Sequence, residues 1–544
     1  MRIRELRVGF LFAIAIAVLA CAPSAASGAT LAVPADFPTI QQAIDAAALG
    51  DIVQIAPGTY VENIRFHGKA ITVRGAGADL TTIDGSALTQ GADCGSTVIF
   101  LDGEGPTSVL EDVTVTGGTG CWENPSGSLT TTKRGGGIIG WLANPTLRDV
   151  TVTGNSMDVL GYGGGAYFKG IPGPLEIVGC RFTLNTSAAG AGIVVDGPGE
   201  LVLEDTDCTF NNSVIDGAGA ILSPRTLTVR RCRFNDNATG SAGGFLGGGC
   251  LLIHIDPTGN PETESALFED CEFSRNLAYI GAGFTGLLAP TTFRRCRFEE
   301  NQAATIAAAA LDSMVVLFDR CVFRGNISPT GRTISTTAHL ASQLTFDHCT
   351  LSGEDGPGIE TFGNPLLITH SVFWGNTGAP LGGFATDSTI EWSDIEGGYP
   401  GTGNIDADPL FVDAASGDLH LLAGSPCIDA GSPAYPFDPD GSTSDLGAFP
   451  FDGFGGFRRG DANTDGGTDI ADGVSILLAL FGSGFTLECA DAADTNDDGA
   501  VDAADAIYTF QYQLLGGAPP PPPNDCGEDP TEDGLDCALG LPGC

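Results

Sequence analysis

Residues 291–304 read TTFRRCRFEENQAA, and the same phrase returns along the chain. It consists of alternating apolar residues, two residues that break the alternation, a cysteine, a phenylalanine two residues later and an asparagine five residues after the cysteine. From Cys271 onward, successive anchors are 25, 25, 28, 22 and 22 residues apart. A nearly constant period of this length predicts a solenoid. Clear copies are anchored at Cys180, Cys232, Cys271, Cys296 and Cys321, and weaker copies at Val113, Val150, Cys208, Cys349, Ser371 and Ser393.

Each copy has the periodicity of β-strands. Apolar residues alternate before the cysteine and again from the cysteine onward, and the two residues between these runs are often charged, which indicates a bend exposed to water. Glycine clusters at 135–137, 163–165 and 247–249 indicate tight corners, and no copy contains a helical stretch. The pattern predicts an all-β fold, a right-handed parallel β-helix of about 12 coils over residues 30–450.

The cysteines admit three interpretations: metal ligands, disulfide partners or packed core residues. Equivalent residues of neighbouring coils stack about 4.8 Å apart, so the cysteine position forms one inward column. Because Val113, Val150 and Ser371 occupy the same position, it selects a small buried side chain, and we favour packing over metal or redox chemistry. Disulfide bonds between some neighbours remain open. The predicted cysteine column holds Cys180, Cys208, Cys232, Cys271, Cys296, Cys321 and Cys349.

Two further columns follow from the same phrase. Phenylalanines form the next inward column, and asparagines that hydrogen-bond from coil to coil form a third, so both are interpreted as scaffold. The phenylalanine column is predicted to hold Phe182, Phe234, Phe273, Phe298, Phe323 and Phe373. The asparagine column is predicted to hold Asn155, Asn185, Asn237, Asn276, Asn301, Asn326 and Asn376.

The FxxN and GG[AG] phrases resemble the repeats of chlamydial polymorphic outer-membrane proteins and, more broadly, the pectin-lyase-like β-helix superfamily. Residues 36–75 support the broader likeness, and the likeness implies that a short helix with Ile40, Ala43, Ile44 and Ala47 on one face caps the solenoid. Residues 407–431 resemble the terminal segment of bacterial surface β-helix proteins. The likeness covers about residues 30–450 and identifies fold better than activity.

Composition and the N-terminus bound the setting of the protein. The formal net charge of −43 over 544 residues argues against binding to nucleic acid or an anionic membrane. Residues 1–29 join three arginines, an apolar run and small residues, which predicts a signal peptide and a secreted or cell-surface protein. A lipoprotein anchored at Cys21 is the alternative. No later segment reaches the length that spans a bilayer, so no transmembrane segment is expected in the mature chain.

Two acidic loops, 461–472 and 494–505, have the spacing of EF-hand calcium loops, with oxygen ligands at positions 1, 3, 5, 9 and 12 and glycine at position 6. They predict two calcium ions. The expected ligands of the first loop are Asp461, Asn463, Asp465, the carbonyl of Gly467, Asp469 and Asp472. Those of the second are Asp494, Asn496, Asp498, the carbonyl of Ala500, Asp502 and Asp505.

Each loop is followed by an apolar helix, and this duplicated unit, over residues 458–517, resembles a type I dockerin domain. The resemblance implies a cohesin-like protein partner. The family's contact positions hold Ile470-Ala471 and Ala503-Ala504, so the hydroxyl pairs of many cellulosomal members are missing. Residues 518–544 are expected to form a proline-rich linker and a tail in which two of three cysteines pair.

No catalytic constellation stands out, so the catalytic residues are unknown. The motifs of polygalacturonase-like members and the aspartate cluster of lyases with this fold are not evident. We interpret Asp347-His348 as a solvated bend, and the histidines as isolated residues. The six are His67, His254, His339, His348, His370 and His420.

Arginines recur at equivalent positions on either side of the cysteine column. This strip consists of Arg181, Arg231, Arg233, Arg295, Arg297 and Arg320. It suits the carboxylate or sulfate groups of an acidic glycan, but the acidic coil at 269–272 also permits a surface ladder of ion pairs. Insertions at 117–137 and 253–265 could wall such a groove, with Cys94 and Cys121 clipping the first.

Two functions therefore remain. The first is a secreted β-helix protein that binds extracellular polysaccharide, with degradation by a lyase or hydrolase left open, and attaches to a partner through a calcium-dependent module. The second is a noncatalytic cell-surface or adhesion protein. Fold alone does not separate them.

Overall fold

The computed structural model describes residues 28–89, 94–122, 132–157, 160–240, 246–253, 265–287, 290–312, 315–336, 342–356, 358, 359–378, 381–383, 387–438, 441–451, 457–482, 486–487, 489–523 and 535. The expected signal peptide, the lipid-anchor alternative at Cys21 and the pairing of the tail cysteines lie outside these residues. Among the helices in the described residues, none is long and apolar enough to cross a bilayer.

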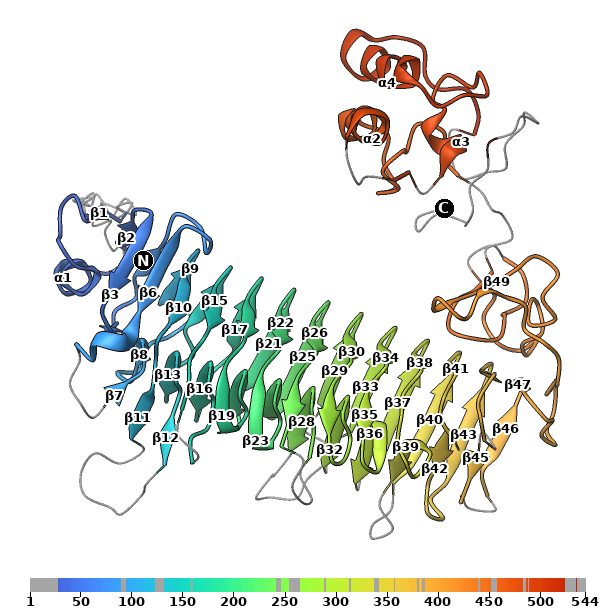
Figure 1. The fold of residues 1–544 in the computed structure, drawn as a ribbon, viewed down its shortest axis with the longest axis horizontal. Coiled ribbons are helices and arrows are strands. Elements are labelled where there is room, and N and C mark those ends of the chain that lie inside the picture. The colour runs from blue at the N-terminus through green and yellow to red at the C-terminus, as the bar shows by residue number, and fades with distance from the viewer. Residues whose placement is uncertain are drawn as a thin grey trace, which may run out of the picture.

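Most of the chain forms a β-solenoid of about 12 turns built from three long parallel sheets, A, B and C. Each turn passes through one strand of each sheet in that order, and the turns stack side by side along the molecule (Figure 1). The sequence prediction of a parallel β-helix is thereby confirmed. Short alternating apolar runs suit this arrangement because every second side chain points into the common core.

Sheet A contains 14 strands. They are β1 (Thr30–Val33), β2 (Ile52–Ile55), β5 (Thr72–Arg74), β9 (Val109–Glu111), β14 (Thr146–Arg148), β17 (Leu175–Val178), β21 (Glu200–Glu204), β25 (Thr226–Arg230), β29 (Ser265–Glu269), β33 (Thr291–Arg294), β37 (Val315–Asp319), β40 (Gln343–Asp347), β43 (Leu366–Thr369) and β46 (Thr389–Glu391).

Sheet B contains 13 strands. They are β3 (Gly58–Val61), β6 (Thr81–Asp84), β10 (Thr114–Thr116), β15 (Thr151–Thr153), β18 (Arg181–Thr183), β22 (Asp207–Thr209), β26 (Arg233–Asn235), β30 (Glu272–Ser274), β34 (Arg297–Glu299), β38 (Val322–Arg324), β41 (Thr350–Ser352), β44 (Val372–Trp374) and β47 (Asp394–Ile395).

Sheet C contains 12 strands. They are β4 (Ile64–Arg65), β8 (Val98–Phe100), β13 (Ile138–Trp141), β16 (Ala166–Lys169), β20 (Ile193–Asp196), β24 (Ala220–Ser223), β28 (Cys250–Ile253), β32 (Phe284–Leu287), β36 (Ile306–Asp312), β39 (Arg332–Thr336), β42 (Ile359–Glu360) and β45 (Leu381–Gly382).

Three small sheets complete the β-structure. A parallel sheet lies between sheets B and C in the middle turns, with β19 (Thr186–Ala189), β23 (Asn212–Asp216), β27 (Ala238–Thr239), β31 (Leu277–Ala278) and β35 (Gln302–Ala303). An antiparallel sheet joins β7 (Cys94–Gly95), β11 (Gly120–Trp122) and β12 (Lys133–Arg134). A hairpin joins β48 (Phe411–Asp413) and β49 (Asp418–Leu421).

The cysteine column lies inside the core, as predicted, with one exception. Strand pairing places Arg181 opposite Asp207 and Phe182 opposite Cys208. Thr206 therefore occupies the cysteine column, where its hydroxyl accepts a hydrogen bond from the Cys180 amide at 3.3 Å. Our assignment of Cys208 to that column is wrong, since Cys208 fills the phenylalanine column between Phe182 and Phe234.

The thiols of this column are free and buried, which favours the packing interpretation. Burial raises the pKa of Cys180 to about 12, so the thiolate that would bind metal or exchange disulfides is suppressed. Rings of the phenylalanine column stack from turn to turn, with Phe273 and Phe298 centroids 4.8 Å apart. A second stack on sheet A includes Phe293 and Phe318 at 5.0 Å.

Asparagine side chains form a continuous ladder at the corner after sheet B. Asn276 Nδ2 donates to Asn301 Oδ1 at 3.0 Å, and Asn301 Nδ2 donates to Asn326 Oδ1 at 2.9 Å. The structure adds Asn211, which the shifted alignment missed, between Asn185 and Asn237. After Asn326 the ladder passes to Glu354, whose Oε1 accepts at 2.9 Å.

Both ends of the solenoid are covered. At the N-terminal end, α1 (Ile40–Ala46) buries Ile40, Ala43 and Ile44 against the core, which confirms the expected capping helix. Thr39 caps it by accepting from the Gln42 amide. The 3₁₀ helix η1 (Gly85–Ala87) follows β6. At the other end, residues 399–407 lie on the last turn, where the amides of Trp392 and Ile395 donate to the carbonyls of Thr402 and Ile405 at 2.8 and 3.0 Å. Leu419 and Ala448 pack further back, on Val322 of β38 in sheet B.

The described residues between 457 and 523 form three helices, α2 (Ile470–Phe481), α3 (Ala490–Ala493) and α4 (Ala503–Leu515). Asp469 and Asp502 begin α2 and α4 with a capping box each. The two helices pack around Ile476 and Ala506, with Phe510 against them. Cys489, just before α3, is disulfide-bonded.

Candidate functional site

The corner between sheets A and B displays the arginine strip. In each turn, the residue before the cysteine column adopts a left-handed backbone, as Arg231, Asp270 and Arg295 do with φ of 50°, 54° and 50°. This conformation reverses the chain within one residue, and the side chain then points to solvent. The left-handed conformation is strained for most residues. It recurs because the stacked sheets on both sides hold the backbone in place.

Charge at this corner alternates from turn to turn. Residues 204–207 contribute Glu204, Asp205 and Asp207. The next turn contributes Arg230, Arg231 and Arg233, the turn after it Glu269, Asp270 and Glu272, and the following turn Arg294, Arg295 and Arg297. The strand registers place these turns in direct succession. Acidic and basic turns therefore form stripes about 4.8 Å apart.

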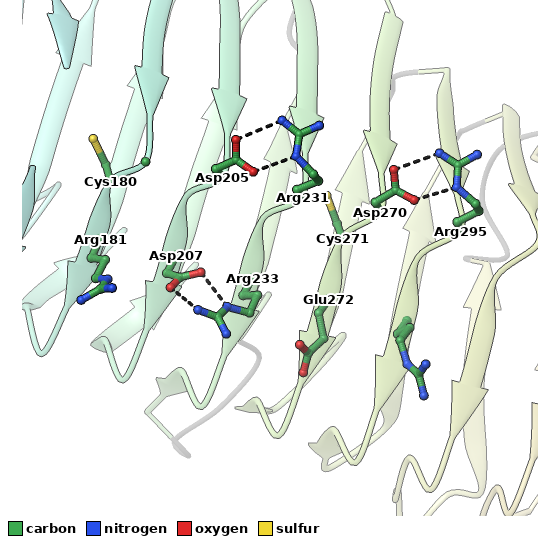
Figure 2. A pocket seen from close by; sticks show the side chains of 12 residues that line it. Cys180, Arg181, Asp205, Asp207, Arg231, Arg233, Asp270, Cys271, Glu272 and Arg295 are labelled. Atoms are coloured by element: carbon green, nitrogen blue, oxygen red, sulfur yellow. Dashed lines mark hydrogen bonds and ion pairs between the residues drawn. The ribbon is translucent and has the colours of Figure 1, made fainter. Parts of the chain in front are cut away.

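Three arginines pair side-on with the preceding acidic turn (Figure 2). Arg231 donates from Nε and Nη2 to Asp205 at 2.7 and 3.0 Å. Arg233 donates in the same way to Asp207 at 2.8 and 2.6 Å, and Arg295 to Asp270 at 2.6 and 2.9 Å. The ion-pair ladder considered from the sequence is therefore present. The arginine side chains are about half exposed, so each pair is expected to stabilise the fold only weakly.

The remaining strip residues are placed differently. Arg181 has no ion-pair partner among the described residues and lies on the exposed face beside Asp207 (Figure 2). Arg297 turns to Glu299 of its own strand at 2.8 Å. Arg320 lies apart from the others and faces Asp438 at 3.6 Å.

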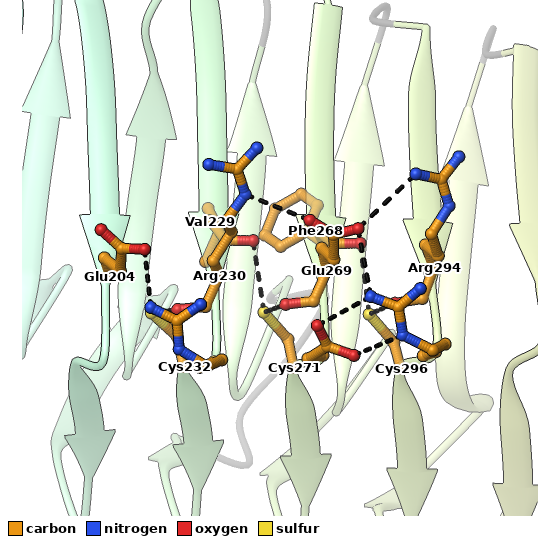
Figure 3. Close-up of polar contacts among 12 residues, drawn as sticks. Glu204, Val229, Arg230, Cys232, Phe268, Glu269, Cys271, Arg294 and Cys296 are labelled. Carbon is orange, nitrogen blue, oxygen red and sulfur yellow. Dashed lines mark hydrogen bonds and ion pairs between the residues drawn. The ribbon is translucent and has the colours of Figure 1, made fainter. Parts of the chain in front are cut away.

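A second row of ion pairs lies at the C-terminal ends of strands β25, β29 and β33 of sheet A (Figure 3). Glu269 accepts from Arg230 Nε at 3.1 Å and lies 3.5 Å from Arg294 Nη1. Arg294 also donates to Asp319 at 3.0 Å. Arg294 therefore links the turn before it to the turn after it.

An open groove with a volume of about 550 Å³ follows the strip across five turns, from residues 179–181 to 295–297. Five arginines and four carboxylates line it, so its formal charge is +1 in a chain of −43. Behind the charged side chains lie Cys180 and Cys271 (Figure 2). The groove brings together Arg181, Arg231, Arg233, Arg295 and Arg297 but not Arg320.

The described part of the first insertion lies away from this groove. Its described residues form β11 and β12, and Cys121 packs with Ile99 and Ile139 on the outer face of sheet C. The expected clip is confirmed, since Cys94 and Cys121 form a disulfide. The tip of that insertion and residues 254–264 of the second lie outside the described residues.

His348 is buried and Asp347 is partly buried, so the interpretation as a solvated bend is wrong. His348 is 1% exposed, and its ring stacks on His370 with centroids 4.6 Å apart. The histidines in the sequence are therefore not all isolated. The cover comes from residues 428–446, which lie some eighty residues later and contribute Tyr435, 5.0 Å from the His348 ring.

This cluster is a nearly closed hydrogen-bond network. Asp347 accepts from Tyr435 Oη at 2.6 Å and contacts His370 Nδ1 at 3.1 Å. His348 Nε2 contacts Ser444 Oγ at 2.6 Å. The histidines and Tyr435 hold the pKa of Asp347 well below its usual range, whereas burial lowers the pKa of His348.

The contacts of this cluster bear on two kinds of chemistry, metal binding and a catalytic triad. Asp347, His348 and His370 are the one set of three among the described residues whose ligand atoms all lie within 4.8 Å. However, His370 Nε2 accepts from the Ser432 amide at 3.2 Å, which leaves its Nδ1 protonated and unable to bind a metal. A Ser444–His348–Asp347 relay is excluded as a catalytic triad because Ser444 is 1% exposed. The cluster fastens the C-terminal segment.

The two acidic loops share one backbone conformation. Asp461 accepts from the amides of Asp465 and Gly466 at 3.1 and 3.0 Å, and Asp494 accepts from Asp498 and Gly499 at 3.2 and 2.8 Å. Position 4 is left-handed in both, at Thr464 and Asp497 with φ of 61°.

The aspartates at position 12 of the two loops also make equivalent hydrogen bonds. Asp472 accepts from Asn463 at 3.1 Å, and Asp505 accepts from Asn496 at 3.2 Å. Burial raises the pKa of each of these carboxyls to about 6. Asn496 Oδ1 is buried without a hydrogen-bond partner among the described residues. The donor types, the loop shape and this orphaned oxygen fit a calcium ion, although neither loop draws three carboxylates within 4.8 Å of one another.

Sequence reasoning missed several residues that shape the groove. Asp205 and Asp207 were overlooked because the anchor was placed at Cys208 instead of Thr206. The apolar pair Leu201 and Leu203 carried the correct signal, since equivalent pairs precede most true anchors, such as Cys180 and Cys232, by five and three residues.

Neither a protein-family model nor a curated protein sequence matches this chain. Among solved structures, the solenoid is similar to a pectate lyase, Pel9A, with a TM-score of 0.39 and 14% identity over 75% of this chain and 90% of that one. It is also similar to the A-module of the mannuronan C-5 epimerase AlgE4 from Azotobacter vinelandii, with a TM-score of 0.34 and 14% identity over 68% and 95%. The periplasmic alginate epimerase AlgG gives a TM-score of 0.34 and 10% identity over 65% and 84%. The fold assignment rests on the strand pairing described above.

Proposed function

We propose that this protein is a secreted, polysaccharide-binding β-helix whose groove holds an acidic glycan. The observation that carries the proposal is the side-on pairing of Arg231, Arg233 and Arg295. Each pair uses Nε and Nη2, so Nη1 keeps its donors, and it has no hydrogen-bond partner among the described residues. The carboxylates thus hold the guanidinium planes in place and leave one edge of each for a ligand.

Binding, not cleavage, is the activity that the groove supports. Its lining in the described residues is made of arginines, carboxylates, a glycine and two buried cysteines. Three of the four carboxylates are held by arginines, whereas hydrolysis of a glycosidic bond uses two available carboxyl groups. Degradation of the glycan is tested alongside binding, through unsaturated products near 235 nm and reducing ends.

The decisive experiment measures retention of the purified chain on acidic and neutral polysaccharides as salt rises. We expect retention on acidic polymers that weakens with salt. Reversing the charges of Arg233 and Arg297 should abolish it. The matched control is Arg275→Gln, which removes an equally exposed bidentate pair with Asp236 outside the groove and should leave retention unchanged. Retention that survives the double reversal contradicts the proposal.

The C-terminal residues 458–517 act, in this proposal, as a calcium-binding module of dockerin type that attaches the β-helix to a cohesin-like partner. The paired loops described above would hold two ions. In addition, α2 exposes an apolar stripe made of Ile470, Val474, Leu478 and Phe481, with exposed fractions of 46%, 45%, 47% and 76%. A stripe of this kind suits a protein partner.

Calcium titration followed by calorimetry tests this half of the proposal. We expect two binding events that are lost in an Asp461→Asn, Asp494→Asn variant and kept in a Glu300→Gln variant. Leu478→Asp should weaken binding to a cohesin domain without changing calcium binding. An unaltered calorimetric trace in the double variant would remove the calcium assignment.

A further inference from the structure

The groove presents its charges in a period of two turns, and this inference rests on the binding function proposed above. Basic turns at 230–233 and 294–297 are separated by the acidic turn at 269–272. At about 4.8 Å a turn, the basic stripes repeat every ~10 Å. Because the groove crosses five successive turns, its long axis runs along the direction of this repeat.

A polysaccharide lying in the groove would place about one sugar over each turn. Each unit of an extended pyranose chain advances by nearly the distance between two neighbouring strands. A sugar above the turn of Arg231 and Arg233 faces guanidinium edges. The next sugar faces Asp270 and Glu272, and the one after it faces Arg295 and Arg297 (Figure 2). Neighbouring sugars therefore meet opposite charges.

Glu272 makes this alternation effective. Its register neighbours on sheet B are Arg233 and Arg297, yet no arginine lies within ion-pair distance of it among the described residues. Arg233 is held by Asp207, Arg297 is held by Glu299, and Glu272 instead accepts from Ser274 Oγ at 2.5 Å. A carboxylate on the sugar above Glu272 is repelled, whereas hydroxyl, amide or ammonium groups there can donate to it.

We propose that the groove selects polysaccharides that carry a negative charge on every second sugar, with a neutral or cationic sugar between, over polyuronates that are charged on every sugar. The distinction opposes simple electrostatics. A uniformly charged polymer carries twice the charge per length, and a merely basic surface would bind it more tightly.

The test compares ten-sugar fragments of hyaluronan, in which glucuronate alternates with N-acetylglucosamine, with ten-sugar fragments of polygalacturonate. Calorimetry on the purified chain at low and physiological salt gives both affinities. We expect hyaluronan to bind about tenfold more tightly despite its lower charge. Equal affinity, or tighter binding of polygalacturonate, overturns the inference while leaving acidic-glycan binding intact. Absence of binding to either fragment, and to longer acidic polymers, removes the proposed function itself.

A substitution at Glu272 gives a second, independent readout. Glu272→Gln should raise the affinity for oligogalacturonate severalfold and leave the hyaluronan affinity nearly unchanged, so that the preference shrinks. The matched control, Glu176→Gln, removes an exposed carboxylate of sheet A that lies outside the groove. If the preference for hyaluronan persists undiminished in Glu272→Gln, the alternation of charge is not its cause, and the inference is overturned.

Discussion

The central and the C-terminal turns of the solenoid differ in whether their ionisable side chains are buried. Among the described residues 132–336, no aspartate, glutamate, lysine, arginine or histidine is buried. Past residue 342, His348, Glu354, His370 and Asp394 are all buried. The backbone position before the cysteine column shows the change directly, since it carries exposed Arg231 and Arg295 in the middle and covered His348 and His370 near the end.

A repeated fold therefore determines where a side chain points but not what surrounds it. The central turns face water, so their charges pair weakly and contribute little to stability. Near the C-terminal end, Tyr435 and Ser444 cover His348. Glu354 is buried for another reason, since it continues the asparagine ladder inside the core. Burial lowers the pKa of His348 and raises that of Glu354. Four predictions examine this contrast.

The largest effect is expected from Asp347→Ala. This change leaves the His370 Nδ1 proton, the Thr369 hydroxyl and the Tyr435 hydroxyl without their acceptor in a buried site. We expect a loss of about 3–5 kcal/mol in the free energy of unfolding of the last turns. Asp207→Ala, which breaks an exposed pair in the central turns, should cost less than about 1 kcal/mol. Denaturant titration measures both, and comparable losses would erase the contrast.

The buried carboxyl group of Glu354 should make the stability of the fold fall as the pH rises toward 8. Burial raises its pKa to about 8, so the folded chain binds a proton that the unfolded chain has released above about pH 4.5. Stability from this group is therefore present at low pH and is lost as the pH rises toward 8.

Glu354→Gln should remove that loss, because the amide can keep the contacts with Asn326 and Thr333. The variant is expected to be more stable than the parent by about 2–4 kcal/mol at pH 9 and nearly equal at pH 4.5. Thermal unfolding at the two pH values provides the measurement. A variant that is less stable at pH 9 would show that the carboxylate is ionised and stabilising inside the ladder.

The buried imidazole of His348 should have the opposite effect, a loss of stability as the pH falls. Burial and the charge of Arg320 lower its pKa, with Asp347 opposing them and His370 adding to them, so the unfolded chain binds the proton first. Stability from this group is present above the unfolded pKa near 6.5 and is lost as the pH falls below it.

Hydrogen exchange at pH 7.5 and 5 should therefore show protection of residues 428–438 and 441–446 falling severalfold more than that of residues 226–239. His348→Gln should reduce the difference between the two segments. Parallel changes in both segments, in parent and variant alike, would assign the effect to other groups.

The smallest effect is expected from Arg294→Gln in the second row of ion pairs on the central turns. It removes exposed contacts with Glu269 and Asp319, so the free energy of unfolding should fall by less than about 1 kcal/mol. Differential scanning calorimetry in low and high salt measures this change, which salt should reduce further. A loss as large as that of Asp347→Ala would make the ladder a main source of stability.

The sequence predicted the parts of this molecule that local periodicity encodes. Cys271, Cys296 and Cys321 fixed the register of the turns, because small buried residues at one position mark a column whatever the loops do. The Thr206 anchor was missed because Cys208 and Phe210 have the same spacing as the cysteine and phenylalanine of the repeat. The correct signal was the alternation of Leu201 and Leu203.

The surroundings of Asp347 and His348 could not be predicted in the same way. Their burial depends on Tyr435, Asp438 and Ser444, which reach them through long-range contacts. No pattern near residue 348 records that cover. Likewise, the sequence indicated the arginines of the groove but not which guanidinium edge their partners would leave available.

The covers at both ends of the solenoid also limit how far the molecule can grow. Each turn presents the same hydrogen-bonding edge to the next, so a bare terminal turn would be a template for another chain. Helix α1 and residues 399–407 occupy those positions. A chain trimmed at either end would expose a self-complementary rim, and a protein that is now a rod of fixed length would become the monomer of a filament.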